Sequence, residues 1–255
     1  MSTDLIDPFG RTVKYVRLSV TDRCDLRCFY CMPGDFRDFS EPDEWLTFTE
    51  IERVIGAFAS LGVRRARITG GEPLLRKNLT ELAGNLAAIP GLHDLSLSTN
   101  AVGLKRHAEA LHSAGISRIN VSLDSLRAER FKQITKGNLD KVIDGLMAAK
   151  HSGFSPIKIN MVVMKGVNDD EIVDMVEFCI EHDFTLRLIE TMPMGDTGRS
   201  ASSHYVDLQE IKRQLAARYD LIPGVMPGGG PARYVQVAGT ELRIGFITPI
   251  SQHFC

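Results

Sequence analysis

A junction between an amphipathic segment and a β-rich run recurs three times in this chain, and it limits the folds available. Each junction carries a glycine followed by an apolar residue: Leu61-Gly62-Val63, Ala114-Gly115-Ile116 and Ser152-Gly153-Phe154. Glycine suits a helix C-cap, where the backbone needs a positive φ. Repeated helix–glycine–strand units indicate parallel strands joined by right-handed crossovers.

The predicted sheet has six strands with helical patterns between them. We expect strands at residues 15–20, 65–69, 95–99, 118–124, 157–164 and 185–190, and helices at 47–61, 79–88, 104–114, 139–152 and 170–182. The first helix opens with Thr47-x-x-Glu50, which is a capping box. Six such strands suit either a doubly wound sheet or a partial barrel.

Polar residues on one face of successive strands favour the barrel. A strand inside a doubly wound sheet is usually apolar on both faces. Here every second position is polar: Arg17 with Ser19, Ser96 with Ser98 and Asn100, Asn120 with Ser122 and Asp124, and Lys158 with Asn160. The apolar side must meet the helices, so the polar side faces the interior. The sequence therefore predicts an α/β fold, a partial (β/α)6 TIM-like barrel that holds a large polar ligand.

The pattern changes after Thr191. A Gly/Ser-rich loop, a helix at residues 208–218, a Pro/Gly loop at 223–231 and a hairpin at 234–246 follow. We expect a barrel domain of residues 1–192 and a C-terminal lateral extension of residues 193–255 packed on it.

Three cations lie in predicted strands among apolar neighbours: Arg17, Arg67 and Lys158. An unpaired buried ion is costly, by several kcal/mol in order of magnitude. One interpretation is that they pair with Glu72, Asp124 or Glu190. The other is that they bind an anionic ligand such as a nucleotide.

The composition points to the cytoplasm and away from nucleic acid and membrane. The formal net charge is −2, no long apolar run is present, and Met1 to Pro8 lack the features of a signal peptide. The chain has five cysteines, an odd number, and three of them lie within eight residues. A secreted disulfide framework would spread an even number along the chain.

These clustered cysteines form the motif Cys24-x-x-x-Cys28-x-x-Cys31, directly after the first predicted strand. Active sites of barrels form at this end of the strands. Three thiolates can bind a [4Fe-4S] cluster and leave one iron open. The alternative is zinc, which normally takes four protein ligands, and no matching second cysteine pair is present.

At these residues the chain resembles the radical S-adenosylmethionine enzymes. Among them it resembles the GTP 3′,8-cyclase branch in particular. The resemblance runs through Asp7 to Pro33, Arg67 to Pro73, Ser98 to Asn100, Asn120 to Asp124, Lys158 to Asn160, Arg187 to Glu190 and Gly245 to Ser251. It thus covers essentially the whole chain.

The resemblance implies a role for individual residues. Cys24, Cys28 and Cys31 hold the cluster. Tyr30, Gly71, Ser122 and Met192 contact S-adenosylmethionine, and a Gly-Gly turn after a strand also suits close approach of a ligand. Arg17, Arg67, Ser98 and Lys158 line the GTP site, with Arg187 as a neighbour. The family usually has threonine where this chain has Ser98, which keeps the hydroxyl.

The implied reaction is cyclisation of GTP to 3′,8-cyclo-7,8-dihydro-GTP, the first step of molybdenum cofactor biosynthesis. A radical derived from S-adenosylmethionine removes hydrogen from the ribose, while the protein orients two nucleotides and excludes water. No side chain is assigned as an acid or base. The implied partners are GTP, an electron donor and a downstream cyclic pyranopterin monophosphate synthase. The chain is expected to act as a monomer or homodimer.

Two cysteines lie outside the motif. Cys179 falls in an apolar helical stretch and is interpreted as a small core residue. Cys255 is the last residue and matches the first ligand of a second [4Fe-4S] cluster in the family, whose other ligands are missing here. If these 255 residues are the whole molecule, we expect it to bind one cluster, to cleave S-adenosylmethionine slowly when reduced and not to cyclise GTP.

Two other functions remain open. One is a radical peptide-maturing enzyme, since those also combine this cluster loop with auxiliary clusters. The affinities for GTP and for a leader peptide distinguish this function from GTP cyclisation. The chain could instead be a zinc-stabilised binding module without catalysis, which metal analysis under anaerobic conditions decides.

Overall fold

The computed structural model describes residues 4–33, 35–36, 45–192, 197, 199, 202–226 and 230–252. Cys255 lies outside the described residues. Contacts between Cα atoms divide the chain into two compact units: residues 1–25, 37–120 and 143–155 in the first, and 26–36, 121–142 and 156–255 in the second. Strand β4 (Ile116–Ser122) and helix α5 (Leu139–His151) have residues in both.

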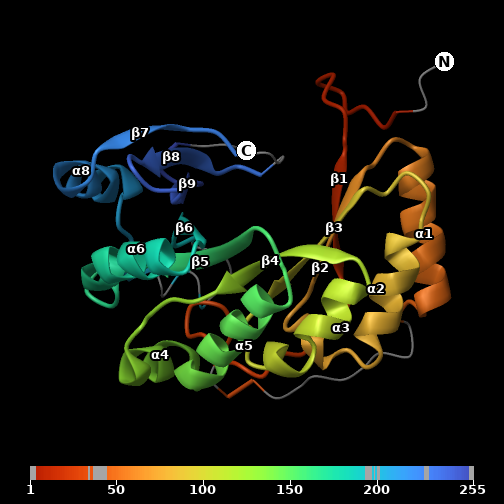
Figure 1. Ribbon diagram of the computed structural model, residues 1–255, viewed down its shortest axis with the longest axis horizontal. Helices are drawn as coiled ribbons and strands as arrows, with labels where there is room; N and C mark the ends of the chain where they lie inside the picture. Colours follow the sequence, from red (N-terminus) through yellow and green to blue (C-terminus); the bar gives the residue numbers. More distant parts are fainter. Residues whose placement is uncertain are drawn as a thin grey trace. The chain divides into compact units, whose positions relative to one another are not determined.

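The first unit contains a parallel sheet with helices on one face. Strands β1, β2 and β3 pair in parallel in that order, and helices α1, α2 and α3 lie along one side of them (Figure 1). Its elements are β1 (Tyr15–Ser19), α1 (Phe48–Ser60), β2 (Arg65–Thr69), a 3₁₀ turn (Pro73–Leu75), α2 (Leu79–Ala87), β3 (Asp94–Thr99), a 3₁₀ turn (Leu104–Arg106) and α3 (Ala108–Ser113).

Local sequence signals explain how these elements begin and end. The capping box is present at α1: the Thr47 hydroxyl accepts from the Glu50 amide, and the Glu50 carboxylate accepts from the Thr47 amide. The three junction glycines have the expected positive φ, +91° at Gly62, +103° at Gly115 and +93° at Gly153. The predicted units of strand and helix are therefore confirmed at their junctions.

The second unit contains a mixed sheet in the order β5-β6-β9-β8-β7. The β5–β6 and β6–β9 pairs are parallel, and β9–β8 and β8–β7 are antiparallel. Helix α6 packs against β6 (Figure 1). Its elements are α4 (Ala128–Thr135), β5 (Ile157–Val163), a 3₁₀ turn (Asp169–Glu171), α6 (Ile172–Glu181), β6 (Thr185–Glu190), a 3₁₀ turn (Ser202–His204), α8 (Leu208–Arg218), β7 (Leu221–Gly224), β8 (Arg233–Val237) and β9 (Arg243–Ile247).

The C-terminal part differs from the expected lateral extension in one respect. Its hairpin strand β9 pairs in parallel with β6, so the extension continues the sheet of the second unit. Strand β7 falls where the sequence indicates a Pro/Gly loop. Proline in this strand is tolerated because β7 lies at a sheet edge, where its missing N–H leaves no ladder bond unmade.

Candidate functional site

The cysteine loop is the segment from Cys24 to Cys31. Its Cys24 end belongs to the first unit and contacts the residue that follows β3. Cys24 is half-buried. The Asn100 side-chain amide donates to the Asp25 carboxylate at 2.6 Å and lies 3.9 Å from the Cys24 sulfur. Asn100 therefore holds the start of the loop against the carboxyl end of β3.

Glu72 fixes Asn100 from the neighbouring strand end. Its carboxylate is almost fully buried and accepts from the Thr99 hydroxyl at 2.8 Å, the Asn100 amide at 2.6 Å and the Leu74 amide at 3.0 Å. Burial raises the pKa of Glu72 to about 7, against the opposing effect of these three hydrogen bonds. One of the two interpretations from the sequence was that this carboxylate pairs with a strand cation. Instead, neutral donors engage it.

The two glycines before Glu72 allow two backbone segments to approach. A Cβ on Gly71 would lie 2.3 Å from the Arg23 carbonyl oxygen and 2.4 Å from that of Asp22. At Gly70 the φ is +152° and a Cβ would lie 2.4 Å from the Thr21 carbonyl oxygen. Close approach was expected between this turn and a ligand. In the structure, the segment that leads into the cysteine loop packs closely against this turn.

A cationic strand face lies in the same unit. The register pairs Arg17 with Arg67 and Arg67 with Ser96, so these side chains share one face of β1, β2 and β3. Arg67 is half-buried, donates to the Ser96 hydroxyl at 3.3 Å and lies over the Tyr15 ring. Burial lowers its pKa, and the charges of Arg118 and Arg17 lower it further.

Arg17 departs from the expectation of a buried cation. Its side chain is exposed, because β1 is an edge strand. Ser98 on β3 is half-buried, and its hydroxyl accepts from the Asn120 side-chain amide at 3.3 Å. The desolvation argument therefore holds for Arg67 but not for Arg17.

The rest of the cysteine loop belongs to the second unit. Cys28 and Cys31 lie on one turn, closed by a 2.9 Å bond from the Cys31 amide to the Cys28 carbonyl. Helix α4, which the sequence analysis did not predict, anchors this segment at its carboxyl end: the Arg27 and Phe29 amides donate to carbonyls of Thr135 and Ile134.

Tyr30 connects this loop to the end of β4. Its hydroxyl donates to the Asp124 carboxylate at 2.7 Å. The other Asp124 oxygen accepts from the Val162 amide at 2.8 Å. Burial raises the pKa of Asp124 to about 6, and burial together with the Asp124 charge raises the pKa of Tyr30 well above its usual value. Asp124 thus ties the aromatic residue of the cysteine loop to β5.

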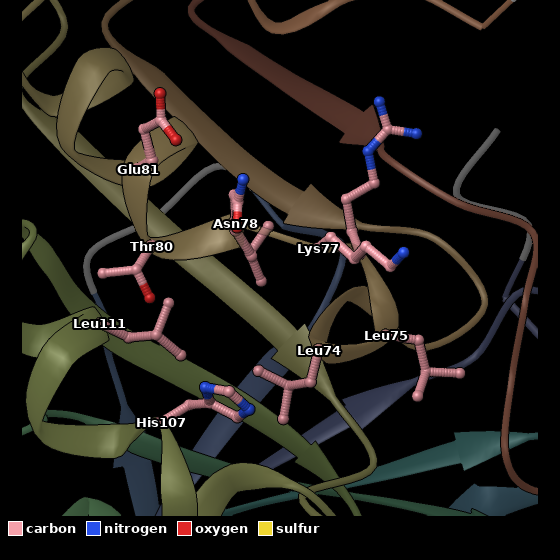
Figure 2. A pocket seen from close by; sticks show the side chains of 10 residues that line it. Leu74, Leu75, Lys77, Asn78, Thr80, Glu81, His107 and Leu111 are labelled. Atoms are coloured by element: carbon pink, nitrogen blue, oxygen red, sulfur yellow. The ribbon is translucent and has the colours of Figure 1, made fainter.

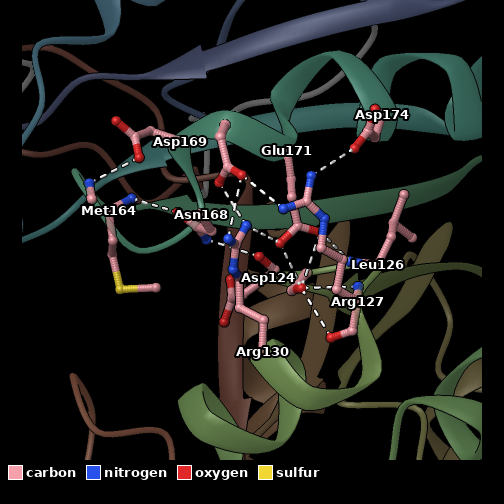
Figure 3. Close-up of polar contacts among 12 residues, drawn as sticks. Asp124, Leu126, Arg127, Arg130, Met164, Asn168, Asp169, Glu171 and Asp174 are labelled. Atoms are coloured by element: carbon pink, nitrogen blue, oxygen red, sulfur yellow. Dashed lines mark hydrogen bonds and ion pairs between the residues drawn. The ribbon is translucent and has the colours of Figure 1, made fainter.

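A network of polar side chains forms hydrogen bonds with the backbone at Asp124 and with the residues that follow it (Figure 3). The Asn168 amide donates to the Asp124 carbonyl at 2.8 Å, and its oxygen accepts from the Met164 amide. Glu171 is fully buried and accepts from the Ser125 hydroxyl, the Leu126 amide and Arg130. From the sequence, only a helix at residues 170–182 was predicted for this segment. The available signal was the run of three acidic residues, Asp169 to Glu171, directly after Asn168.

Lys158 lies on β5 in a second cationic face. It is 7% exposed, and its ammonium lies 5.9 Å from the centre of the Tyr234 ring on β8. Gly245, between them on β9, is required there, since a Cβ would lie 2.6 Å from the Tyr234 ring. The register pairs Arg187 on β6 with both Asn160 and Gly245. The second unit therefore gathers Lys158, Arg187 and an aromatic ring on one face.

The remaining predicted residues have diverse surroundings. Ser122 and Met192 are exposed. Cys179 is fully buried in α6, and burial raises the pKa of its thiol, which confirms it as a core residue. Among the described side chains, no three of the types His, Cys, Asp and Glu gather around a single metal-ion position. The thiolates of a cubane bind separate irons and stand further apart than ligands of one ion.

Two cavities of the first unit are lined by other residues. One of about 510 Å³ lies beside the start of α2, lined by residues that include Leu74, Lys77, Asn78 and His107 (Figure 2). Another of about 340 Å³ lies between the end of β1 and Trp45. Neither is lined by a residue predicted to bind cluster, co-substrate or substrate. None of the helices formed by described residues is long and apolar enough to cross a bilayer.

Two family profiles match the chain. That of the Radical SAM superfamily matches residues 18–179, and that described as Molybdenum Cofactor Synthesis C matches residues 184–255. Among individual proteins, the chain is 47% identical to "GTP 3′,8-cyclase 2" of Pseudomonas aeruginosa over 98% of its own length and 76% of that protein. It is also 47% identical to "GTP 3′,8-cyclase" of Hydrogenovibrio crunogenus, over 98% of this chain and 77% of the relative.

The structure is similar to that of Streptococcus suis SuiB bound to the precursor peptide SuiA. The TM-score is 0.67 at 21% identity, over 81% of this chain and 45% of that one. At this identity the similarity establishes the fold, and it confirms the expected partial-barrel architecture.

Proposed function

Because this chain belongs to the radical S-adenosylmethionine superfamily and, within it, to the GTP 3′,8-cyclase family, we propose the residues that carry its reaction. The reaction is the radical cyclisation of GTP to 3′,8-cyclo-7,8-dihydro-GTP, the first step of molybdenum cofactor biosynthesis. The observation that carries this assignment is near-half identity over almost the whole chain, through both matched regions.

Cys24, Cys28 and Cys31 hold a [4Fe-4S] cluster. The donor set fits such a group: three thiols follow one strand end, within a loop fixed by Asn100 at one end and by α4 at the other. The cluster supplies the electron that cleaves the carbon–sulfur bond of S-adenosylmethionine. A second cluster, with Cys255 among its ligands, belongs to the same proposal.

S-adenosylmethionine binds at Tyr30, Gly71, Ser122 and Met192. The Tyr30 contact with Asp124 fixes the ring through its hydroxyl, so the rest of the residue is presented in one orientation. The backbone at Gly71 is fixed as well, because its amide donates to the Thr21 carbonyl at 2.8 Å. Rigid backbone groups of this kind orient a co-substrate without loss of conformational entropy on binding.

GTP binds at Arg17, Arg67, Ser98 and Lys158, with Arg187 nearby. The support is electrostatic: Arg17 and Arg67 share one strand face, and the charges there already lower the pKa of Arg67. Lys158 is buried beside an aromatic ring. A triphosphate would neutralise such faces through charge-assisted hydrogen bonds, which are the stronger class in proteins.

Several further features are part of the proposal. Residues 1–192 form the radical S-adenosylmethionine domain and 193–255 the C-terminal extension. The chain acts in the cytoplasm as a monomer or homodimer. It receives electrons from a donor protein and passes its product to a cyclic pyranopterin monophosphate synthase.

The test is an anaerobic incubation of the protein, reconstituted with both clusters of this proposal, with GTP, S-adenosylmethionine and dithionite. The expected products are 5′-deoxyadenosine and the cyclised nucleotide in equal amounts, separated by chromatography. Cys28→Ala serves as the inactive control. Formation of 5′-deoxyadenosine without any cyclised GTP would contradict the proposal.

The alternative of peptide maturation has one supporting observation, the similarity in fold to SuiB bound to a precursor peptide. Equilibrium binding separates the two functions. Tight binding of a leader peptide without binding of GTP would favour the alternative.

A further inference from the structure

The side chain of Asn100 has one orientation, fixed by the backbone next to it. Its oxygen accepts a hydrogen bond from the Val102 amide at 3.0 Å. Because the oxygen and nitrogen of a side-chain amide are told apart by their partners, this backbone donor directs the NH2 group the other way. That group faces the start of the cysteine loop, where it donates to Asp25 at 2.6 Å and lies 3.9 Å from the sulfur of Cys24.

The backbone that carries Asn100 is held as firmly. Its amide donates to the buried carboxylate of Glu72 at 2.6 Å. The preceding hydroxyl, that of Thr99, donates to the same carboxylate and accepts from the Ala101 amide. Asn100 itself is only 8% exposed. These residues and Cys24 all belong to the first unit, so the NH2 group of Asn100 is held beside Cys24 before any cluster binds.

The two hydrogens of this NH2 group have two acceptors. One hydrogen is donated to the Asp25 carboxylate, and the other is left for the Cys24 sulfur. A thiol sulfur is a weak acceptor, but cysteine binds iron as the thiolate, which carries negative charge. Hydrogen bonds to ionised groups are the stronger class. The contact therefore favours the thiolate of Cys24, which is the form that the proposed function requires.

A donor at this sulfur has an electronic consequence. Hydrogen bonds to the sulfur atoms of an iron–sulfur cluster, together with the net charge, set its reduction potential. Reduction adds negative charge that spreads onto the sulfur atoms, so an N–H donor stabilises the reduced state more than the oxidised state. The N–H group of Asn100 therefore raises the potential, whereas the negative charge of Asp25 lowers it.

We propose that Asn100 is a positioning residue of the first cluster: it donates an N–H group to the Cys24 thiolate and raises the reduction potential of the cluster. This inference rests on the proposed function, which requires an electron to enter that cluster. Asn100 is neither a ligand of the cluster nor among the residues proposed to bind S-adenosylmethionine or GTP.

Two substitutions separate the N–H donor from the contact that holds the loop. Asn100→Leu keeps the approximate shape of the side chain and removes both N–H groups. Asp25→Ala removes the bond between Asn100 and the loop, while the Val102 amide still directs the NH2 group toward Cys24. Each protein is reconstituted under anaerobic conditions and its iron content is measured. The midpoint potential of the first cluster is then obtained by redox titration followed by electron paramagnetic resonance, its signal being the one that Cys28→Ala lacks.

The two variants should differ in the sign of the shift. For Asn100→Leu, the equilibrium constant of one-electron reduction should fall about threefold to tenfold, the equivalent of one hydrogen bond. This is a fall of about 30 to 60 mV, at about 59 mV for each tenfold change. For Asp25→Ala, the potential should stay the same or rise, because a negative charge near the cluster is lost.

Two results would overturn the inference. A fall of equal size in both variants would mean that Asn100 only holds the loop. An unchanged potential in Asn100→Leu would mean that no donor acts on Cys24.

A measurement on the wild-type protein decides the question if Asn100→Leu does not fold. Asparagine labelled with a heavy nitrogen isotope in its side-chain amide is incorporated, and the reduced first cluster is studied by pulsed electron paramagnetic resonance. We expect a coupling between the cluster and the labelled nitrogen. An intact cluster without this coupling would contradict the inference alone. A wild-type chain that takes up no [4Fe-4S] cluster would contradict the proposed function, and the inference with it.

Discussion

Glu72 should make the stability of this protein depend on pH, and Glu72→Gln should remove that dependence. Its carboxyl has a pKa of about 7 in the folded chain, against a reference value of 4.5. The folded chain therefore binds more protons than the unfolded chain between these pH values. The free energy of unfolding must then fall as the pH rises through this window, because ionisation of the buried group is unfavourable.

The size of the effect follows from the shift. One pKa unit corresponds to about 1.4 kcal/mol, so the shift amounts to about 3 kcal/mol, most of which falls between pH 5 and pH 8. Glutamine has no titration in this range. The glutamine side chain has one oxygen that accepts hydrogen bonds, and an NH2 group takes the place of the second carboxylate oxygen. One of the hydrogen bonds from Leu74, Thr99 or Asn100 is therefore lost. That loss costs about 1 kcal/mol at both pH values.

The assay is urea unfolding of the cluster-free chain with reduced thiols, followed by circular dichroism at pH 5 and pH 8. We expect the difference in unfolding free energy between the two pH values to change by about 2–3 kcal/mol in Glu72→Gln relative to wild type. The control is Glu81→Gln, an exposed carboxyl in the first turn of α2. Parallel pH dependence in wild type and Glu72→Gln would refute the reasoning, since the carboxyl would then be ionised throughout.

Three further outcomes are expected. Cys28→Ala should lose the iron of the first cluster and all cleavage of S-adenosylmethionine, because three thiolates leave no spare ligand; retained cleavage would remove Cys28 from the ligand set. Lys158→Ala or Arg17→Ala should weaken GTP binding about tenfold to a hundredfold while S-adenosylmethionine cleavage persists, as expected for a charge-assisted contact. Equal loss of both functions would mean that these cations stabilise the fold. Gly71→Ala should lower the midpoint of thermal unfolding, because its Cβ would lie 2.3 Å from a backbone oxygen. Gly56→Ala is the control, since a Cβ there has open space and should not lower the midpoint. Equal midpoints for the two variants would contradict the close approach at Gly71.

Local signals in the sequence were sufficient for the strands, the junctions and the cysteine loop. A capping box and a glycine with positive φ each depend on a few adjacent residues, and both are present as expected at Thr47 and Gly62. Strand β7 was not predicted, because Pro223 is unfavourable in a strand unless the strand lies at an edge. Edge position depends on which strands pair, and pairing of β9 with β6 joins residues far apart in the chain.

Contacts within the candidate site were harder to predict for the same reason. The bond between Tyr30 and Asp124 spans 94 residues. Helix α4 anchors the cysteine loop, and its buried apolar residues are Phe131 and Ile134. Two such positions give only a weak helical periodicity in the sequence. The residue types at these positions were visible in the sequence, but their partners depend on tertiary packing.

The carboxylates at the strand ends bear on one of the two interpretations of the strand cations, that of charge pairing. Glu72, Asp124 and Glu190 each follow or end a strand, and each accepts hydrogen bonds from backbone amides: those of Leu74 and Asn100, of Val162, and of Ile250 and Ser251, respectively. Strand ends leave amides without ladder partners, and a buried carboxylate satisfies several of them at once. These three carboxylates therefore fasten loops to the sheet through backbone amides. Arg17 and Arg67 share one strand face, and their positive charge supports the proposal that a triphosphate binds there.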